Sequence, residues 1–101
     1  ATAAGLHPFC YGHAADGNLH VRLLREGREE AESRRIEEAV TAIYAEAVRL
    51  GGTITAEHGV GLILRELLPL RRDAPFLSAM RAIKQALDPN GILNPGKVLP
   101  G

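Results

Sequence analysis

The feature that most constrains the fold is a turn signal with one histidine on each side of it. Residues 13–20 read HAADGNLH. An Asp-Gly pair between apolar runs predicts a β-hairpin, because a two-residue type I′ turn needs two positive φ values. A turn on Asp16-Gly17 would place His13 directly opposite His20, with Cβ atoms about 4.5–5.5 Å apart. The spacing therefore allows one divalent metal ion to take a nitrogen from each ring.

The strands of this hairpin are expected to have one reactive and one apolar face. We place them at Pro8–Gly12 and Leu19–Leu24, with residues 25–27 closing the ladder. Because side chains alternate along a strand, one face would carry the polar and aromatic groups Phe9, Tyr11, His13, His20, Arg22 and Leu24. The opposite face is apolar and should pack on a helix; it holds Cys10, Gly12, Val21 and Leu23.

Apolar residues at three-to-four spacing predict helices in the rest of the chain. We expect them over about Glu29–Leu50, before Gly51-Gly52, and over Leu62–Leu68 and Asp73–Leu87. In the last helix Asp73 is the expected N-cap, and the expected buried stripe consists of Phe76, Met80, Ile83 and Leu87. Residues 53–55 form either a brief strand or an extended approach to the next loop.

Composition excludes several classes of protein. The 101 residues are 46% apolar with a formal net charge of zero, which suits one small domain that buries about two-thirds of its extended-chain surface. The interspersed charges form no basic stripe, so nucleic acid is not an expected partner. The lone Cys10 cannot form an internal disulfide, and we expect a cytoplasmic protein. No apolar run approaches the roughly 20 residues of a membrane span.

Glu57 and His58 form a second candidate site, in a loop bracketed by glycines. Glycine lets the backbone turn sharply and approach another group closely. Two imidazoles and one carboxylate leave open positions on a metal, as in catalytic sites, whereas structural zinc sites are closed by four ligands. Adjacent residues do not readily reach one ion, so we expect Glu57 to bind metal and His58 to face substrate.

Each candidate residue also has an ordinary structural explanation. The hairpin histidines would then hydrogen-bond loop carbonyls, and Asp16 would bond its own backbone in the turn. Glu57 would be an exposed acid and His58 a helix cap. Arg22, two residues beyond His20 on the reactive face, either clamps a substrate carboxylate or forms a surface ion pair.

Three motifs, in this order, resemble the C-terminal part of the FAD-linked oxidases of the vanillyl-alcohol-oxidase type. They are residues 12–20 (GHAADGNLH), 51–61 (GGTITAEHGVG) and 87–97 (LDPNGILNPGK). The resemblance covers nearly the whole chain. Within that family it is strongest to the D-lactate, glycolate and D-2-hydroxyglutarate dehydrogenases.

The resemblance implies a partial ferredoxin-like α+β cap domain, which covers the substrate side of a flavin held by a separate FAD-binding domain absent from this chain. His13, His20 and Glu57 would be ligands of a divalent metal such as zinc, manganese or iron. His58 would be the general base at a small D-2-hydroxy-acid substrate, and Asn94 would approach the FAD.

Some positions depart from the family's usual pattern. Ala56 stands where a glycine is usual, and Leu64 where a lysine is often found. Arg22 stands where an asparagine commonly contacts substrate, and we assign the substrate contact to it. These departures bear on the choice of substrate more than on the class of reaction.

Two functions from different classes follow. The first is the C-terminal substrate- and metal-binding portion of a flavin-dependent dehydrogenase, formed by residues 1–101 as one domain. The alternative is a stand-alone metal-binding or interaction module without catalytic activity. Glu57-His58 and the tail 94–97 favour the first, because a binding module has no use for a flavin-facing end. A small sheet with open edges also predicts a homo-oligomer.

Overall fold

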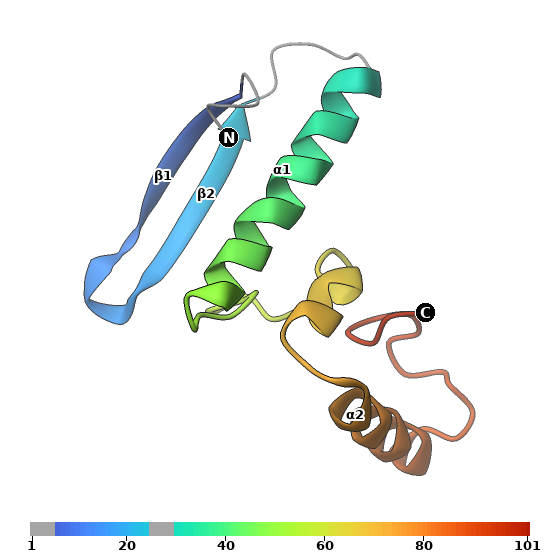
Figure 1. Ribbon diagram of the computed structural model, residues 1–101. Coiled ribbons are helices and arrows are strands. Elements are labelled where there is room, and N and C mark those ends of the chain that lie inside the picture. The colour runs from blue at the N-terminus through green and yellow to red at the C-terminus, as the bar shows by residue number, and fades with distance from the viewer. Residues whose placement is uncertain (1–5, 25–29) are drawn as a thin grey trace. The chain divides into compact units, whose positions relative to one another are not determined.

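A computed structural model describes residues 6–24 and 30–101 of the chain (Figure 1). Its elements, with η for a 3₁₀ helix, are β1 (His7–His13), η2 (Ala14–Asp16), β2 (Asn18–Leu24), α1 (Glu30–Arg49), η3 (Arg65–Leu70) and α2 (Ala74–Leu87). The described part is α+β with a two-stranded antiparallel sheet, as predicted. It divides into two compact units, the residues up to Ile43 and Tyr44–Gly101. The expected closing of the ladder at 25–27 lies outside the described residues.

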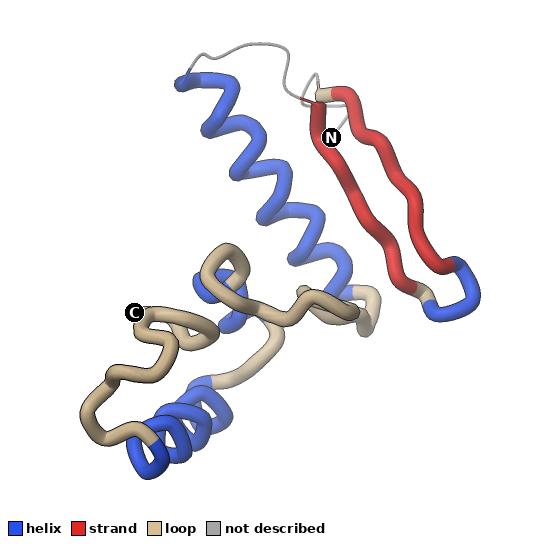
Figure 2. The backbone as a smooth tube through the Cα atoms, turned by 180° about the vertical axis from the view of Figure 1, so that it is seen from behind, coloured by secondary structure: helices blue, strands red, loops and turns tan. Residues whose placement is uncertain are grey.

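The hairpin of β1 and β2 has a wider loop than expected. Figure 2 shows the helical turn at its tip: Ala14–Asp16 form η2, and Gly17 follows with φ 65°. A type I′ turn would require a positive φ at Asp16 as well as at Gly17. The observed loop confines that conformation to glycine, which adopts it at no steric cost.

The wider loop changes the strand register by two residues. His13 pairs with Asn18, and His20 pairs with Tyr11. The expectation that the two histidines lie directly opposite one another is therefore wrong. A shift of one residue would have turned every side chain to the other face, whereas a shift of two preserves the faces. His13 and His20 remain on one face, as diagonal neighbours.

Much of the hairpin is open to solvent. Every residue of β1 is exposed, including Cys10 on the face expected to be apolar. On β2 the side chains of Val21 and Leu23, which share that face, are half-buried. The apolar face is thus covered in part, along β2. Leu6 and Glu32 are the buried side chains described in this unit.

Helix α1 ends at the double glycine, as the sequence predicts. Gly51 adopts φ 87°, and its N–H donates to the carbonyl oxygen of Val48 at 3.0 Å. The N–H of Gly52 donates to the carbonyl oxygen of Ala47 at 2.8 Å. This pair of bonds is a Schellman motif, which satisfies carbonyl groups that the end of a helix would otherwise leave unbonded.

The second unit has a small core made of Ile54, Leu68 and Leu77. Partly buried side chains pack around it, namely Tyr44, Val48, Val60, Leu67 and Met80. Ile54 is 3% exposed, and residues 53–55 lie outside any strand. The segment is therefore not a strand; it leads into the following loop and is anchored in the core by Ile54. The helical piece expected at Leu62–Leu68 is η3, which begins at Arg65.

Helix α2 begins at its expected cap but buries a different stripe. The Asp73 carboxylate accepts a hydrogen bond of 3.0 Å from the N–H of Phe76. Phe76, Ile83 and Leu87 are exposed, so the expectation that they are buried is wrong. Leu77 faces the core instead. Phe76 lies under the guanidinium of Arg72, which is 4.5 Å from the ring centroid.

The inward stripe of α2 continues in an ion pair. Met80 is half-buried, as is Lys84 one turn later. Lys84 bonds to Asp88, directly after the helix, and Asp88 is 5% exposed. Positions 77, 80, 84 and 88 recur at the three-to-four spacing of one helix face. A pattern based on apolar residues alone misses this face, because charged residues occupy half of it.

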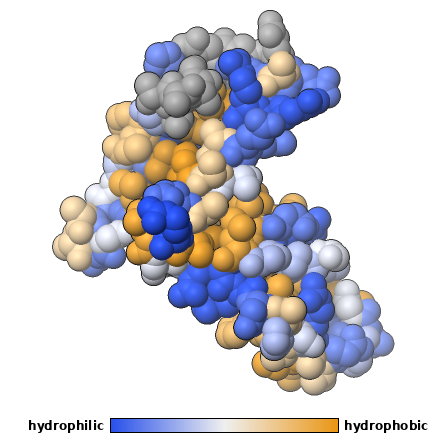
Figure 3. Space-filling model, viewed as in Figure 1, coloured by the Kyte–Doolittle hydropathy of each residue, from blue (hydrophilic) through white to orange (hydrophobic). Residues whose placement is uncertain are grey.

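Large apolar side chains are exposed in both units, and Figure 3 shows hydrophobic areas on the side in view. Leu19 of β2 is 66% exposed, and Ile63, before η3, is 90% exposed. Within residues 6–24 and 30–101, no helix is both long and apolar enough to cross a membrane. Contiguous exposed apolar areas are typical of surfaces that contact other protein.

Candidate functional site

Ring side chains line one face of the hairpin. Phe9, Tyr11 and His13 alternate along β1, and His20 lies opposite Tyr11 on β2. The rings of Tyr11 and His20 stack, with centroids 4.9 Å and planes 22° apart. Phe9 contacts Tyr11 in turn, at a centroid distance of 5.7 Å. This face carries the reactive groups that side-chain alternation assigns to it.

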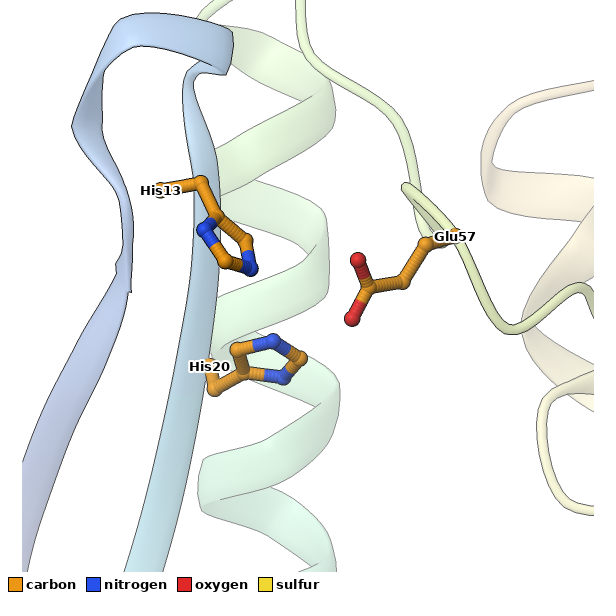
Figure 4. A group of neighbouring side chains, drawn as sticks. All are labelled: His13, His20 and Glu57. Atoms are coloured by element: carbon orange, nitrogen blue, oxygen red, sulfur yellow. The ribbon is translucent and has the colours of Figure 1, made fainter.

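His13 and His20 meet near the turn, and both rings project to the same side of the hairpin (Figure 4). Their centroids are 6.4 Å apart with an interplanar angle of 75°. A ring nitrogen of each lies within 4.8 Å of the other. Two nitrogens on one tetrahedral zinc ion, each at about 2.0–2.1 Å from it, lie about 3.4 Å apart. A movement of the rings by no more than about 1.4 Å would therefore let the pair hold one ion.

Glu57 and His58 adjoin in the second unit. Oε1 of Glu57 lies 3.2 Å from Nε2 of His58, and both side chains are well exposed. Directly after the pair, Gly59 and Gly61 have φ values of 75° and 55°, so the backbone turns where the glycine-bracketed sequence predicts. The contact orients the imidazole, as a carboxylate beside a histidine ring does.

Arg22 lies on the histidine face of the hairpin. It is paired with Phe9 and follows His20 by two residues, and its side chain is exposed. The first unit therefore places His13, His20 and Arg22 on one face of the hairpin. Glu57 belongs to the second unit, and its coordination of the same metal ion as the two histidines is part of the proposed function.

Asn94 lies in the tail after α2, in the left-handed region at φ 46°. Its carbonyl oxygen accepts a hydrogen bond from the N–H of Lys97 at 3.3 Å. Further along, the N–H of Val98 donates to the oxygen of Gly61 at 2.6 Å, and Arg65 donates to the oxygen of Gly96 at 2.7 Å. The tail that carries Asn94 is therefore bound to the loop that follows Glu57 and His58.

Lys84 and Asp88 anchor the start of this tail, and sequence reasoning did not single them out. The Asp88 carboxylate accepts hydrogen bonds from Lys84 and from the N–H groups of Leu93 and Ile92, at 3.0 and 3.1 Å. The bond from Lys84 is the main cause that lowers the pKa of Asp88 below its ordinary value; burial opposes it, and the two backbone donors assist. The feature of the sequence that could have identified this pair is its i,i+4 spacing.

Residues 1–98 match the family described as FAD linked oxidases, C-terminal domain. Glycolate oxidase subunit GlcD of Bacillus subtilis is 46% identical over 88 residues, which are 87% of this chain and 19% of that protein. D-2-hydroxyglutarate dehydrogenase of Xanthomonas citri is 41% identical over 90 residues, with the same coverage of 87% and 19%. D-lactate dehydrogenase of Anaerostipes hadrus is 37% identical over 89 residues, again 87% and 19%.

These matches and the fold first define a class, an α+β domain of flavin-linked oxidoreductases. Within that class the chain belongs to the family of C-terminal domains of FAD-linked oxidases, as the three sequence motifs predict. Membership implies FAD as the cofactor of the protein that contains such a domain. The chain spans about a fifth of the length of these relatives, 19% in each.

Proposed function

We propose that this chain is the substrate- and metal-binding C-terminal portion of a flavin-dependent enzyme that dehydrogenates a small D-2-hydroxy acid. The names of the three relatives refer to glycolate, D-2-hydroxyglutarate and D-lactate, and each of these compounds carries a hydroxyl group beside a carboxylate. The observation that carries the proposal is the pair of imidazoles, His13 and His20, on one face of the hairpin with ring nitrogens within 4.8 Å.

The donor set of the proposed metal site is His13, His20 and the carboxylate of Glu57. Imidazole and carboxylate together suit zinc, manganese or iron, and three protein ligands leave positions open for substrate. The proposal is supported by the two histidine rings, which lie close enough for a small movement to bring a nitrogen of each to one ion. When bound, the metal would polarise the hydroxyl and carboxylate oxygens of a 2-hydroxy acid as a Lewis acid.

Two further side chains have roles at the substrate. The guanidinium of Arg22, on the histidine face, would bind the substrate carboxylate through paired hydrogen bonds, for which its planar fork is suited. His58 would take the hydroxyl proton at an imidazole nitrogen, with its ring oriented by the contact to Glu57. Histidine is the side chain that enzymes use most often for such a proton transfer.

The chemistry that FAD would supply is acceptance of a hydride from the α-carbon. His58 would take the hydroxyl proton, and loss of both from the 2-hydroxy acid leaves the 2-oxo acid. Asn94 would be the residue of this chain that approaches the flavin. The contacts of the tail support this role, because the bonds from Val98 to Gly61 and from Arg65 to Gly96 hold the turn that includes Asn94. A side chain that meets a cofactor benefits from such a fixed backbone.

Metal titration of the chain tests the site directly. Zn²⁺ binding is measured by calorimetry for the wild type and for His13→Gln, His20→Gln and Glu57→Gln. Loss of any one ligand should weaken binding by more than about tenfold, since even outer-shell changes cost 10–100-fold. The matched control is His7→Gln, at the far end of the same face, which should bind as the wild type does. Equal affinity in all variants would disprove the site.

Substrate class is tested on the zinc-loaded chain with two matched acids. D-lactate and propionate have the same carbon chain and differ in the hydroxyl group. D-lactate should perturb the NMR signals of residues 13 and 20 at lower concentration than propionate, because it can bind through the hydroxyl and the carboxylate together. Arg22→Gln should weaken the response to both acids. Identical titrations of the two acids would contradict recognition of a 2-hydroxy acid.

A further inference from the structure

Tyr11 and His20 form a close ring contact on the reactive face of the hairpin. They are directly paired across β1 and β2, and their rings stack at 4.9 Å with an interplanar angle of 22°. Tyr11 is 46% exposed, whereas His20 is half-buried. The phenol ring therefore covers one side of the imidazole that the proposed metal site uses.

We propose that Tyr11 is a positioning residue for His20, a role that rests on the proposed metal site. The lone pair of an imidazole nitrogen lies in the plane of the ring, so the ring plane determines where a metal can bind. Stacking on Tyr11 restricts rotation of the His20 ring about its Cβ–Cγ bond. It holds that plane at 75° to the ring of His13, with a nitrogen of each ring within 4.8 Å of the other.

The face of the Tyr11 ring, and not its hydroxyl group, makes this contact. A stacked arrangement with planes 22° apart needs the aromatic surface alone. Tyr11→Phe should therefore preserve the positioning of His20, and substitution by an aliphatic residue should abolish it. A conformation fixed before binding lowers the entropic cost of ordering a ligand side chain, so metal affinity should depend on the ring.

Phe9 provides a matched control on the same strand and the same face. Its ring contacts Tyr11 at a centroid distance of 5.7 Å, and it is paired with Arg22 rather than with a histidine. Removing the Phe9 ring deletes a comparable aromatic group from β1 without uncovering His20. A general effect of aromatic residues on the hairpin would appear in both variants, whereas positioning of His20 requires Tyr11.

The test compares Tyr11→Phe, Tyr11→Val, Tyr11→Leu and Phe9→Val in the full chain. The first readout is the NMR shift of the His20 ring protons without metal, which the stacked ring displaces. The second is the dissociation constant for Zn²⁺. Contacts between the amide groups of Gly12 and Leu19, which are paired, report whether the hairpin is intact. Two aliphatic variants, Tyr11→Val and Tyr11→Leu, are included so that the comparison with the wild type can use whichever of them retains an intact hairpin.

The two aliphatic variants should lose the displaced shifts of His20 and bind Zn²⁺ about tenfold more weakly, the lower end of the range for residues that orient metal ligands. Tyr11→Phe and Phe9→Val should retain both properties. Unchanged His20 signals in the aliphatic variants, or equal effects of Tyr11→Val and Phe9→Val, would overturn the proposal. Loss of the His20 shifts in a chain whose wild type binds no metal would refute the metal site and support the positioning of His20.

Discussion

Lys84 donates a hydrogen bond to the carboxylate of Asp88, one helical turn away, and a second one of 2.7 Å to the carbonyl oxygen of Leu93. Asp88 is 5% exposed, and its carboxylate also accepts hydrogen bonds from the N–H groups of Ile92 and Leu93. The pair thus joins the end of α2 to the residues that precede Asn94. A charged group with several partners in this position makes the tail sensitive to pH.

We predict that acid weakens the second unit through Asp88. Its pKa is lower in the folded chain than the ordinary value of 3.8, so the ionised carboxylate stabilises the fold above that value. This contribution is lost as the pH falls below 3.8 toward the lowered folded pKa. Urea unfolding from pH 6 to about pH 2 measures it, and Asp88→Asn should reduce both the midpoint at pH 6 and its change with pH.

A suitable control is Glu46→Gln. Glu46 pairs with Arg49 at 2.6 Å, but both side chains are more than half exposed. The bond lowers the pKa of Glu46 as well, yet exposed pairs contribute little to stability. Equal pH dependence in Asp88→Asn and Glu46→Gln would show that the buried network after α2 does not stabilise the tail.

The faces of the hairpin could be predicted from sequence, but its register could not. Strand alternation alone places His13 and His20 on one side, and any even shift preserves that result. The register depends on loop length, and an Asp-Gly pair fits both a two-residue turn and the observed loop, in which only Gly17 has a positive φ. The stacking of Tyr11 on His20 depends on the register and therefore could not be predicted from the sequence.

For α2, the N-cap could be predicted from the sequence, but the face that is buried could not. The Asp73 cap depends on residues within one turn and could be predicted. Burial depends on which face of the helix meets Ile54 and Leu68, residues that lie outside α2. The apolar pattern favoured Phe76, whereas the core contacts Leu77. The resemblance of the three motifs to a known family, by contrast, was enough to predict the family.

We predict that Glu57 and His58 can be separated by mutation. Glu57→Gln should lower the metal content, because the proposed ligand is its carboxylate. His58→Ala should retain metal and, in the complete flavoprotein, slow flavin reduction by about 10²–10⁴-fold, the usual contribution of a general base. Metal analysis and rapid-mixing kinetics measure the two effects. Equal loss of metal in both variants would show that the assignment of roles is wrong.

We predict that Gly12→Ala disrupts the histidine pair. Gly12 lies between Tyr11 and His13, and an added Cβ would be 2.1 Å from the carbonyl oxygen of Asn18. The strands would have to separate at the turn, at a cost of about 1–3 kcal/mol, as for other overpacked sites. The NMR contacts across the strands should weaken, and titration with Zn²⁺ should show a lower affinity. Gly101→Ala, where the added atom meets nothing within 4 Å, should change neither; an intact hairpin in Gly12→Ala would contradict the prediction.

The last prediction is that the isolated chain self-associates. In the part of the chain that the structure describes, the sheet has two strands. Strand β1 is exposed along its whole length, so it can pair with a strand of another copy unless it is covered. Light scattering at micromolar concentration under reducing conditions should therefore show a dimer or a larger species. A lysine on an edge strand opposes such pairing, and Cys10→Lys on β1 should shift the chain toward monomer. Thr41→Lys, at an exposed position of α1, adds the same charge away from the strands and should leave the assembly unchanged. A wild-type monomer with cooperative unfolding would show that the open strand does not drive association.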